Sequence, residues 1–219
     1  MPRLLFEKTG NAIWISHLDL MRLFQRAFKR AGLSLKHSQG FSPRPLVAIA
    51  LPLSVGVESK CELLDFDLDG ETVPNKEIME RLNAALVEGV TVRQVYDDGA
   101  KIKHLAYLSC VVSHEYDTGI PEDAEKKICS LFAQACLTVT KKGKNGPTEQ
   151  DIIPMIKKLN ITEADSNTLE LHALVCCQNP SLNPMQLSAA VCAYLPELTP
   201  DFSKCCRVEI YDSEEKIFR

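Results

Sequence analysis

Residues 16–45 read SHLDLMRLFQRAFKRAGLSLKHSQGFSPRP, a basic helical pattern followed by a loop rich in glycine, proline and hydroxyl residues. Ser16 is a favourable N-cap, and Asp19 stands three residues later, where it can form a variant of the capping box. Gly32 suits the residue just past a helix end. The stretch therefore predicts a helix over residues 17–31 that leads directly into the loop.

This helix has an apolar stripe and a basic face. Leu20, Phe24 and Ala27 recur at helical spacing, as expected of a helix that packs on a sheet. The basic face and the loop supply the candidate binding residues Arg22, Arg26, Lys29, Arg30, His37, Ser38, Gln39 and Arg44. Two interpretations stay open: the cations form a solvated polar face, or the helix and loop together bind an anion.

The charge distribution is uneven along the chain. Residues 1–45 hold eight Lys or Arg and two acidic residues, a net charge of +6. The remainder holds 17 basic and 27 acidic residues, a net charge of −10, which gives −4 for the whole chain. A basic end on an acidic body can present a local positive field to a polyanion or to an acidic protein surface.

Length and composition indicate an ordinary globular protein. The 219 residues suit one large domain or two domains of about 100 residues each. No apolar run has the length of a membrane span and the N-terminus lacks a signal-peptide core, so we expect a cytoplasmic protein without membrane contact. The nine cysteines follow no framework spacing, which favours buried thiols.

The expected fold class is α+β, with two tandem ferredoxin-like (βαββαβ) halves built on antiparallel sheets. Asp97-Asp98-Gly99 marks the expected boundary, so the halves span residues 1–98 and 99–219. In the first half we expect a strand at residues 3–8, which residues 13–15 extend or pair with. We also expect a buried strand at 46–51, strands at 61–68 and 90–96, and helices at 17–31 and 75–87.

In the second half the same order recurs less clearly. We expect strands at residues 105–116, 137–140, 151–159, 169–177 and 206–211, and helices at 121–135 and 184–194. The segment KKGKNGP after residue 140 predicts a basic hairpin-like loop. Its lysines suit a flexible phosphate contact or a simply soluble turn: Lys141, Lys142 and Lys144.

The sequence contains no complete catalytic set, so whether the protein is an enzyme stays open. No C-x-x-C pair is present, and we expect neither a metal site nor a cofactor. The motifs G-x-S-x-G and G-x-G-x-x-G and the P-loop are absent as well. His17 is the best candidate for a general acid or base, because a helix N-terminus favours a neutral imidazole. A structural role for His17 at the same turn is the alternative.

Several motifs resemble the bacterial family of radical-SAM-linked proteins, which carry a domain of unknown function. They are ISHLDLMRLFQRAFKRAGL, SQGFSPRP, LPLSVGVESKCELLDFDL, KKGKNGPTEQDIIPMIKKL and SLNPMQL. The resemblance implies a radical-SAM partner protein and a link to RNA or ribosome maturation. The chain itself lacks the C-x-x-x-C-x-x-C spacing of a radical-SAM enzyme. Asp151 and the two isoleucines before Pro154 depart from the family, where an Arg is typical.

Three hypotheses follow. The first is a cytoplasmic RNA-binding or adaptor protein that presents structured RNA or a ribosomal component to a radical-SAM enzyme. The second is an RNA-processing or RNA-modifying enzyme in which His17 acts as acid or base. The third is a protein–protein adaptor whose basic helix contacts an acidic surface and no RNA.

Overall fold

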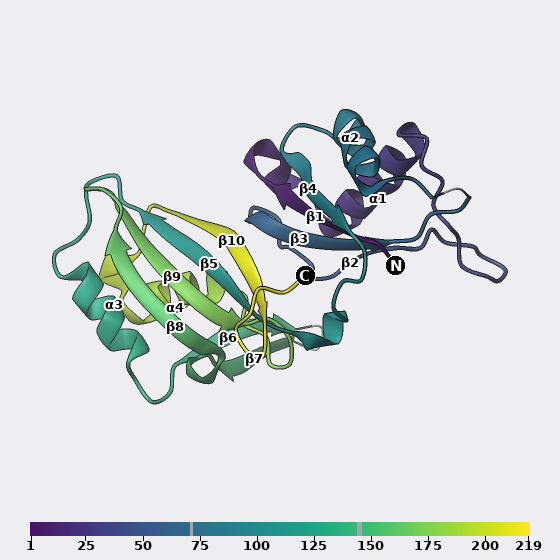
Figure 1. Cartoon of the computed structure of the whole chain (residues 1–219). Coiled ribbons are helices and arrows are strands. Elements are labelled where there is room, and N and C mark those ends of the chain that lie inside the picture. The colour runs from purple at the N-terminus through teal and green to yellow at the C-terminus, as the bar shows by residue number, and fades with distance from the viewer. Residues whose placement is uncertain (71, 144–145) are drawn as a thin grey trace. The chain divides into compact units, whose positions relative to one another are not determined.

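The computed structural model describes residues 1–70, 72–143 and 146–219, and the chain forms an α+β protein (Figure 1). It divides into two compact units. The first unit comprises residues 1–102 together with Arg219, and the second comprises residues 103–218.

The first unit is an antiparallel sheet with two helices. Its strands lie in the order β4-β1-β3-β2. The elements in chain order are β1 (Arg3–Lys8), the 3-10 helix η1 (Gly10–Trp14), α1 (His17–Arg30), β2 (Val47–Ile49), β3 (Glu58–Phe66), α2 (Asn75–Ala85) and β4 (Val90–Tyr96).

Helices α1 and α2 share one hydrophobic core with the sheet. Phe24 of α1 meets Phe6 of β1 edge to face, with ring centroids 4.8 Å apart. Phe28, one turn later, lies 5.1 Å from Phe66 of β3. All four rings are fully buried, and each contributes about 1.5–3 kcal/mol relative to exposure. This packing fixes α1 on the sheet, and its cations lie on the exposed face.

The expected continuation of the first strand at residues 13–15 is wrong, because Gly10–Trp14 forms the 3-10 helix η1. Lys8 explains how this turn is held. Its buried Nζ donates hydrogen bonds to the carbonyl oxygens of Ile13 (3.0 Å) and Ile15 (2.8 Å). Burial lowers the pKa of Lys8, and the two carbonyls compensate part of the lost hydration. These two hydrogen bonds hold the backbone immediately before the start of α1.

The strand expected at residues 46–51 is shorter and less buried than predicted. Only Val47–Ile49 pairs with β3, and Ala48 is exposed. An apolar run of this length favours a buried strand on pattern alone. Here the run sits at a sheet edge, where one side of the strand meets solvent.

The second unit contains a four-stranded antiparallel sheet in the order β10-β5-β9-β8 and a separate β6-β7 hairpin. Its elements in chain order are η2 (Ile102–His104, which begins in the first unit), β5 (Leu105–Glu115), α3 (Ala124–Phe132), β6 (Thr138–Gly143), β7 (Gly146–Asp151), η3 (Ile153–Met155), β8 (Ile156–Glu163), β9 (Thr168–Cys176), α4 (Met185–Tyr194), η4 (Pro196–Leu198) and β10 (Phe202–Asp212).

The strand expected at residues 151–159 is wrong in its first half. Residues 153–155 form η3, with Pro154 inside it, and the strand β8 starts at Ile156. Proline supplies no N–H for a sheet ladder, which explains the break. Gly146 and Pro147, expected in the basic loop, and residues 148–150, which no expected element covered, form strand β7 together with Asp151 and pair with β6.

The helices are short. None of them, within the three described ranges, is long and apolar enough to cross a bilayer.

Candidate functional site

Helix α1 begins at a well-formed cap. The Ser16 hydroxyl accepts a hydrogen bond from the Asp19 backbone N–H (3.2 Å) and donates one to the Asp19 carboxylate (2.7 Å). This hydroxyl contact, followed by the Arg22 guanidinium, lowers the pKa of Asp19. Asp19 is thus committed to the cap and to Arg22.

The four predicted cations of α1 are all exposed, but they are not equally available. Arg22 forms an ion pair with Asp19 at 3.0 Å, and Arg30 donates to the Ala85 carbonyl at 2.5 Å. The side chains of Arg26 and Lys29 form no hydrogen bond or ion pair with any residue that the structure describes. These two side chains are therefore available to an external partner without breaking an internal contact.

The loop that leaves α1 is an ordered, narrow hairpin over residues 36–46. The Leu46 N–H donates to the Lys36 carbonyl (2.7 Å), and the Ser38 N–H donates to the Arg44 carbonyl (2.9 Å). The Ser38 hydroxyl in turn accepts from the Arg44 N–H at 3.0 Å. Ser38 therefore shapes the hairpin, while the exposed Arg44 side chain stays without a partner among the described residues.

The tip of this hairpin, residues 39–43, stands out in solvent. Figure 1 shows the loop between α1 and β2 extending away from the helices and strands of its unit. Gly40 there has a φ of 129°, which a side chain would strain. Phe41 is fully exposed, at 112% of its reference area, so its ring packs on nothing in the described chain.

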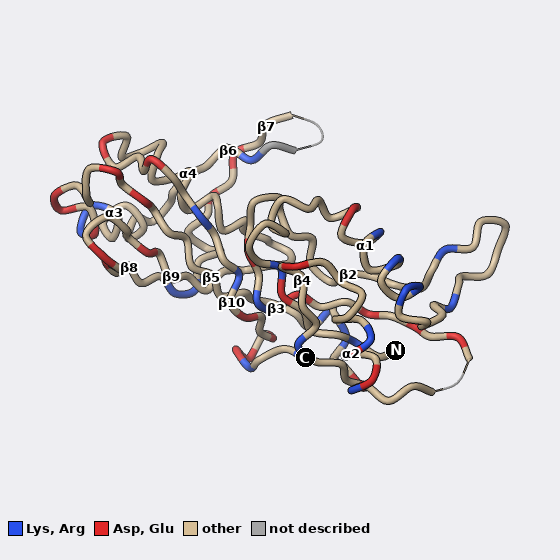
Figure 2. The backbone as a smooth tube through the Cα atoms, turned by 90° about the horizontal axis from the view of Figure 1, so that it is seen from above, with Lys and Arg blue, Asp and Glu red and all other residues tan. Residues whose placement is uncertain are grey.

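Lys and Arg follow one another along α1 and recur in the loop beyond it (Figure 2). We call this surface the basic corner and define it by Arg22, Arg26, Lys29, Arg30, His37 and Arg44. A cavity of about 440 Å³ lies within it, between the last turn of α1 and the base of the hairpin. Lys29 and His37, predicted separately, both line this cavity, together with Gln25, Phe28, Gly32, Leu33, Ser34, Leu35 and Pro45.

The remaining predicted binding residues are not part of the basic corner. Gln39 is at the exposed hairpin tip. Lys141 is exposed on β6 in the second unit, whereas the Lys142 side chain and the whole of Lys144 lie outside the described residues.

His17 is half-buried at the first turn of α1. Its imidazole has no hydrogen-bond partner among residues 1–70, 72–143 and 146–219. Asp19 is engaged with Ser16 and Arg22, and His37 lies across the 36–46 hairpin from Pro45. The described structure thus provides no group that orients His17 as an acid or base.

Two observations bear on metal and thiol chemistry in the described chain. No group of three His, Cys, Asp or Glu residues there is placed to hold a metal ion. Burial raises the pKa of Cys110 and of Cys177 to about 12, which keeps both thiols protonated at neutral pH.

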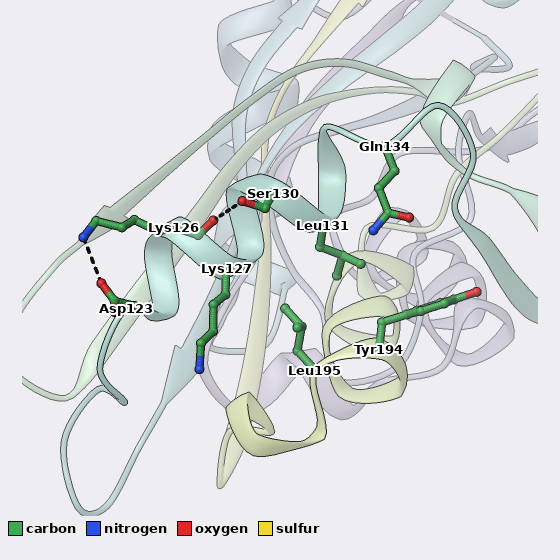
Figure 3. Close-up of a pocket in the computed structure, with 8 residues that line it drawn as sticks. All are labelled: Asp123, Lys126, Lys127, Ser130, Leu131, Gln134, Tyr194 and Leu195. Atoms are coloured by element: carbon green, nitrogen blue, oxygen red, sulfur yellow. Dashed lines mark hydrogen bonds and ion pairs between the residues drawn. The ribbon is translucent and has the colours of Figure 1, made fainter.

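A second cavity, of about 530 Å³, lies between α3 and the end of α4 in the second unit. Figure 3 shows Lys126 pointing to Asp123, with which it pairs at 2.9 Å. Lys127 pairs with Glu197 at 3.5 Å. Both cations are neutralised within the protein, which distinguishes this cavity from the one in the basic corner.

The sequence analysis did not identify Phe41, or Leu35 and Pro45 of the cavity in the basic corner, as candidate site residues. Phe41 did carry a signal, since a phenylalanine between Gly40 and Ser42 is unusual in an otherwise polar tip. Leu35 and Pro45 carried none, because they meet only through the backbone pairing of the hairpin.

Comparison with known proteins gives a family match and a fold match. The family model described as "Uncharacterized protein conserved in bacteria (DUF2344)" matches residues 2–184. No curated protein matches. Among solved structures, one chain from the crystal structure of a Cbf5-Nop10-Gar1 complex is similar, with a TM-score of 0.53 and 9% identity over 95% of this chain. The match covers 48% of that chain, so the present chain spans about half its length.

A second solved structure, of an unknown protein from Galdieria sulphuraria, matches with a TM-score of 0.26 and 11% identity, over 94% of this chain and 97% of that one. At 9% identity, the likeness to the chain from the Cbf5-Nop10-Gar1 complex is a likeness of fold.

Proposed function

The chain belongs to the bacterial family DUF2344, and from that premise we propose that it is an RNA-binding accessory protein whose contact surface is the basic corner. The observation that carries the proposal is a set of exposed cations whose side chains form no hydrogen bond or ion pair with a described residue: Arg26, Lys29 and Arg44. Unpaired arginine and lysine side chains on an ordered surface can contact phosphates without first breaking an ion pair.

The exposed aromatic ring favours RNA over an acidic protein surface. Proteins that bind single-stranded or looped RNA combine phosphate contacts with aromatic side chains on which unpaired bases stack. Phe41 stands at the tip of a hairpin that carries Arg44 at its base. The hairpin therefore offers a stacking surface and a cation on the same short segment.

We infer, in addition, that each unit is a ferredoxin-like half, with the expected limits of residues 1–98 and 99–219. The support is the order of the elements. In the first unit β-α-β-β-α-β comes with the strand order β4-β1-β3-β2. In the second, β10-β5-β9-β8 has the same pattern once the β6-β7 hairpin is set aside as an insertion. Sheets of this topology are common RNA-binding scaffolds.

The partner enzyme enters through the resemblance of the sequence motifs to radical-SAM-linked proteins. We propose that the protein brings RNA, or a ribosomal component, to a radical-SAM enzyme. Affinity purification of the tagged protein, with and without ribonuclease, tests this. Recovery of a radical-SAM protein that survives ribonuclease supports a direct contact, and consistent absence of such a protein contradicts it.

The binding function itself is tested by fluorescence anisotropy of a labelled RNA stem-loop titrated with the purified protein. We expect saturable binding at low salt. Absence of binding at about 50 mM salt, where phosphate contacts are strongest, would overturn the proposal.

Replacing Phe41 by alanine is expected to weaken stem-loop binding about tenfold, or ~1.4 kcal/mol, which is typical of one base–aromatic stack. Stability is expected to be unchanged, because the ring contacts nothing in the described chain. Phe202→Ala is the matched control, since Phe202 is a half-exposed phenylalanine in the second unit, 51% exposed. Equal losses in the two variants would remove the special role of Phe41.

A further inference from the structure

The cavity in the basic corner has apolar walls and a polar mouth. Phe28 and Leu33 are buried, and Leu35 and Pro45 are half-buried. Lys29, Ser34 and His37 are exposed, so the polar groups of this cavity gather where it opens to solvent. Its volume of about 440 Å³ falls in the range of small-molecule sites, which are mostly apolar with a few polar groups that fix orientation.

The charges around the cavity favour an uncharged ligand group inside it and an anionic group at its mouth. The cavity lies at the C-terminal end of α1, where the helix dipole is negative and disfavours an anion. Lys29 lines the cavity and is exposed at its mouth, and Arg26 lies one turn earlier on α1. A ligand with a flat uncharged part and an attached phosphate would therefore place the flat part inside and the phosphate at Lys29.

A nucleotide has this chemistry. The face of its base can pack on the half-buried Leu35 and Pro45, and the edges of the base offer donors and acceptors for Gln25, Ser34 and His37. The α3–α4 cavity lacks this combination, because its lysines are paired with Asp123 and Glu197.

We propose that the cavity between α1 and the 36–46 hairpin receives one unstacked nucleobase, with the phosphate of that nucleotide at Lys29. The inference rests on the proposed function for its source, since the nucleotide would be one that leaves the stack in an RNA loop. A free nucleotide shares the chemistry, and the test separates the two sources.

Ser34→Phe tests the proposal, because it fills the cavity without changing charge. Ser34 is exposed, and its backbone carbonyl, which the substitution keeps, accepts a hydrogen bond from the Asp69 N–H at 2.8 Å. Ser54→Phe is the control, since Ser54 is an exposed serine of the same unit away from the cavity lining. Three probes are titrated into both variants and the wild type: an RNA stem-loop, a perfect RNA duplex of the same length, and adenosine monophosphate.

We expect Ser34→Phe to bind the stem-loop about tenfold more weakly, and the duplex as tightly as wild type does, with Ser54→Phe unchanged on both. If the wild type binds adenosine monophosphate and Ser34→Phe does not, the site is one for a free nucleotide. This conclusion about the cavity does not require RNA binding. If the wild type binds no RNA, only the proposed function is contradicted. Equal binding of stem-loop and mononucleotide by wild type and Ser34→Phe overturns the nucleobase site.

A stem-loop with 2-aminopurine in its loop gives a readout on the wild type alone, independent of how Ser34→Phe folds. Its fluorescence is expected to change as the base leaves the loop stack for the cavity. Unchanged fluorescence at saturation, with 2-aminopurine placed in turn at each loop position, contradicts the proposal.

Discussion

A variant with Arg26→Glu, Lys29→Glu and Arg44→Glu will lose RNA affinity by more than about 100-fold at 0.1 M salt. Each phosphate contact to a single strand releases about 0.7 counterion, which is worth roughly fivefold in affinity at that salt concentration. Three lost contacts multiply to about 100-fold, and the new negative charges add repulsion. Fluorescence anisotropy of the labelled stem-loop measures the loss.

The matched control changes the same number of charges elsewhere. Lys60, Lys101 and Lys103 are exposed, and their side chains form no hydrogen bond or ion pair with a described residue. Lys60→Glu, Lys101→Glu and Lys103→Glu change the net charge by the same amount as the first variant. If binding depends on the basic corner, the control should stay within a few-fold of the wild type. A similar loss in both variants would mean that net charge, rather than this surface, attracts the RNA.

A second large effect is expected in the second unit, on acid stability. His114 of β5 is completely buried, and neither of its ring nitrogens has a hydrogen-bond partner in the described chain. Burial lowers the pKa of His114 from 6.5 to about 4. Between these two values the unfolded chain binds a proton that the folded chain refuses, so the free energy of unfolding falls as the pH falls.

The contribution of His114 is fully present above pH 6.5, declines from there to about pH 4, and is constant below. Its size is on the order of 3 kcal/mol, at 1.36 kcal/mol for each unit of pKa difference. His114→Leu should remove this part of the acid sensitivity. It should be no less stable at neutral pH, because it removes buried polar atoms that have no partner.

Urea unfolding at pH 7, 5.5 and 4.5 measures the effect, with His104→Leu as a control at an exposed histidine. The carboxylates titrate equally in all three proteins, so the difference between His114→Leu and wild type isolates His114. Parallel stability curves for the wild type and His114→Leu would show that His114 is charged or solvated in the folded state.

Helix α1 could be predicted from sequence because its signals are local. The cap at Ser16, the apolar stripe and the stop at Gly32 all act within a few residues, and the structure has the helix at His17–Arg30. The element order of the first unit was also predictable, since each strand has its own apolar run. Phe6 and Phe66, which belong to two of these apolar runs, are both buried in the core.

The features that escaped prediction depend on long-range pairing. Strand β7 has no apolar alternation and forms only because its backbone pairs with β6. The cavity depends on the Lys36–Leu46 backbone bond, which brings Leu35 and Pro45 to the same place across ten residues. Which cations are free could not be predicted either, because Arg30 is engaged by a carbonyl 55 residues away, on Ala85.

The salt dependence of stem-loop binding tests the central claim most directly. The wild type should bind less tightly as salt rises, with a linear dependence of log K on log salt. The neutralised variant with Arg26→Gln, Lys29→Gln and Arg44→Gln should show a slope shallower by about 2, from three contacts at roughly 0.7 each. Identical slopes for the two proteins would contradict the account, since the phosphates would then lie against another surface.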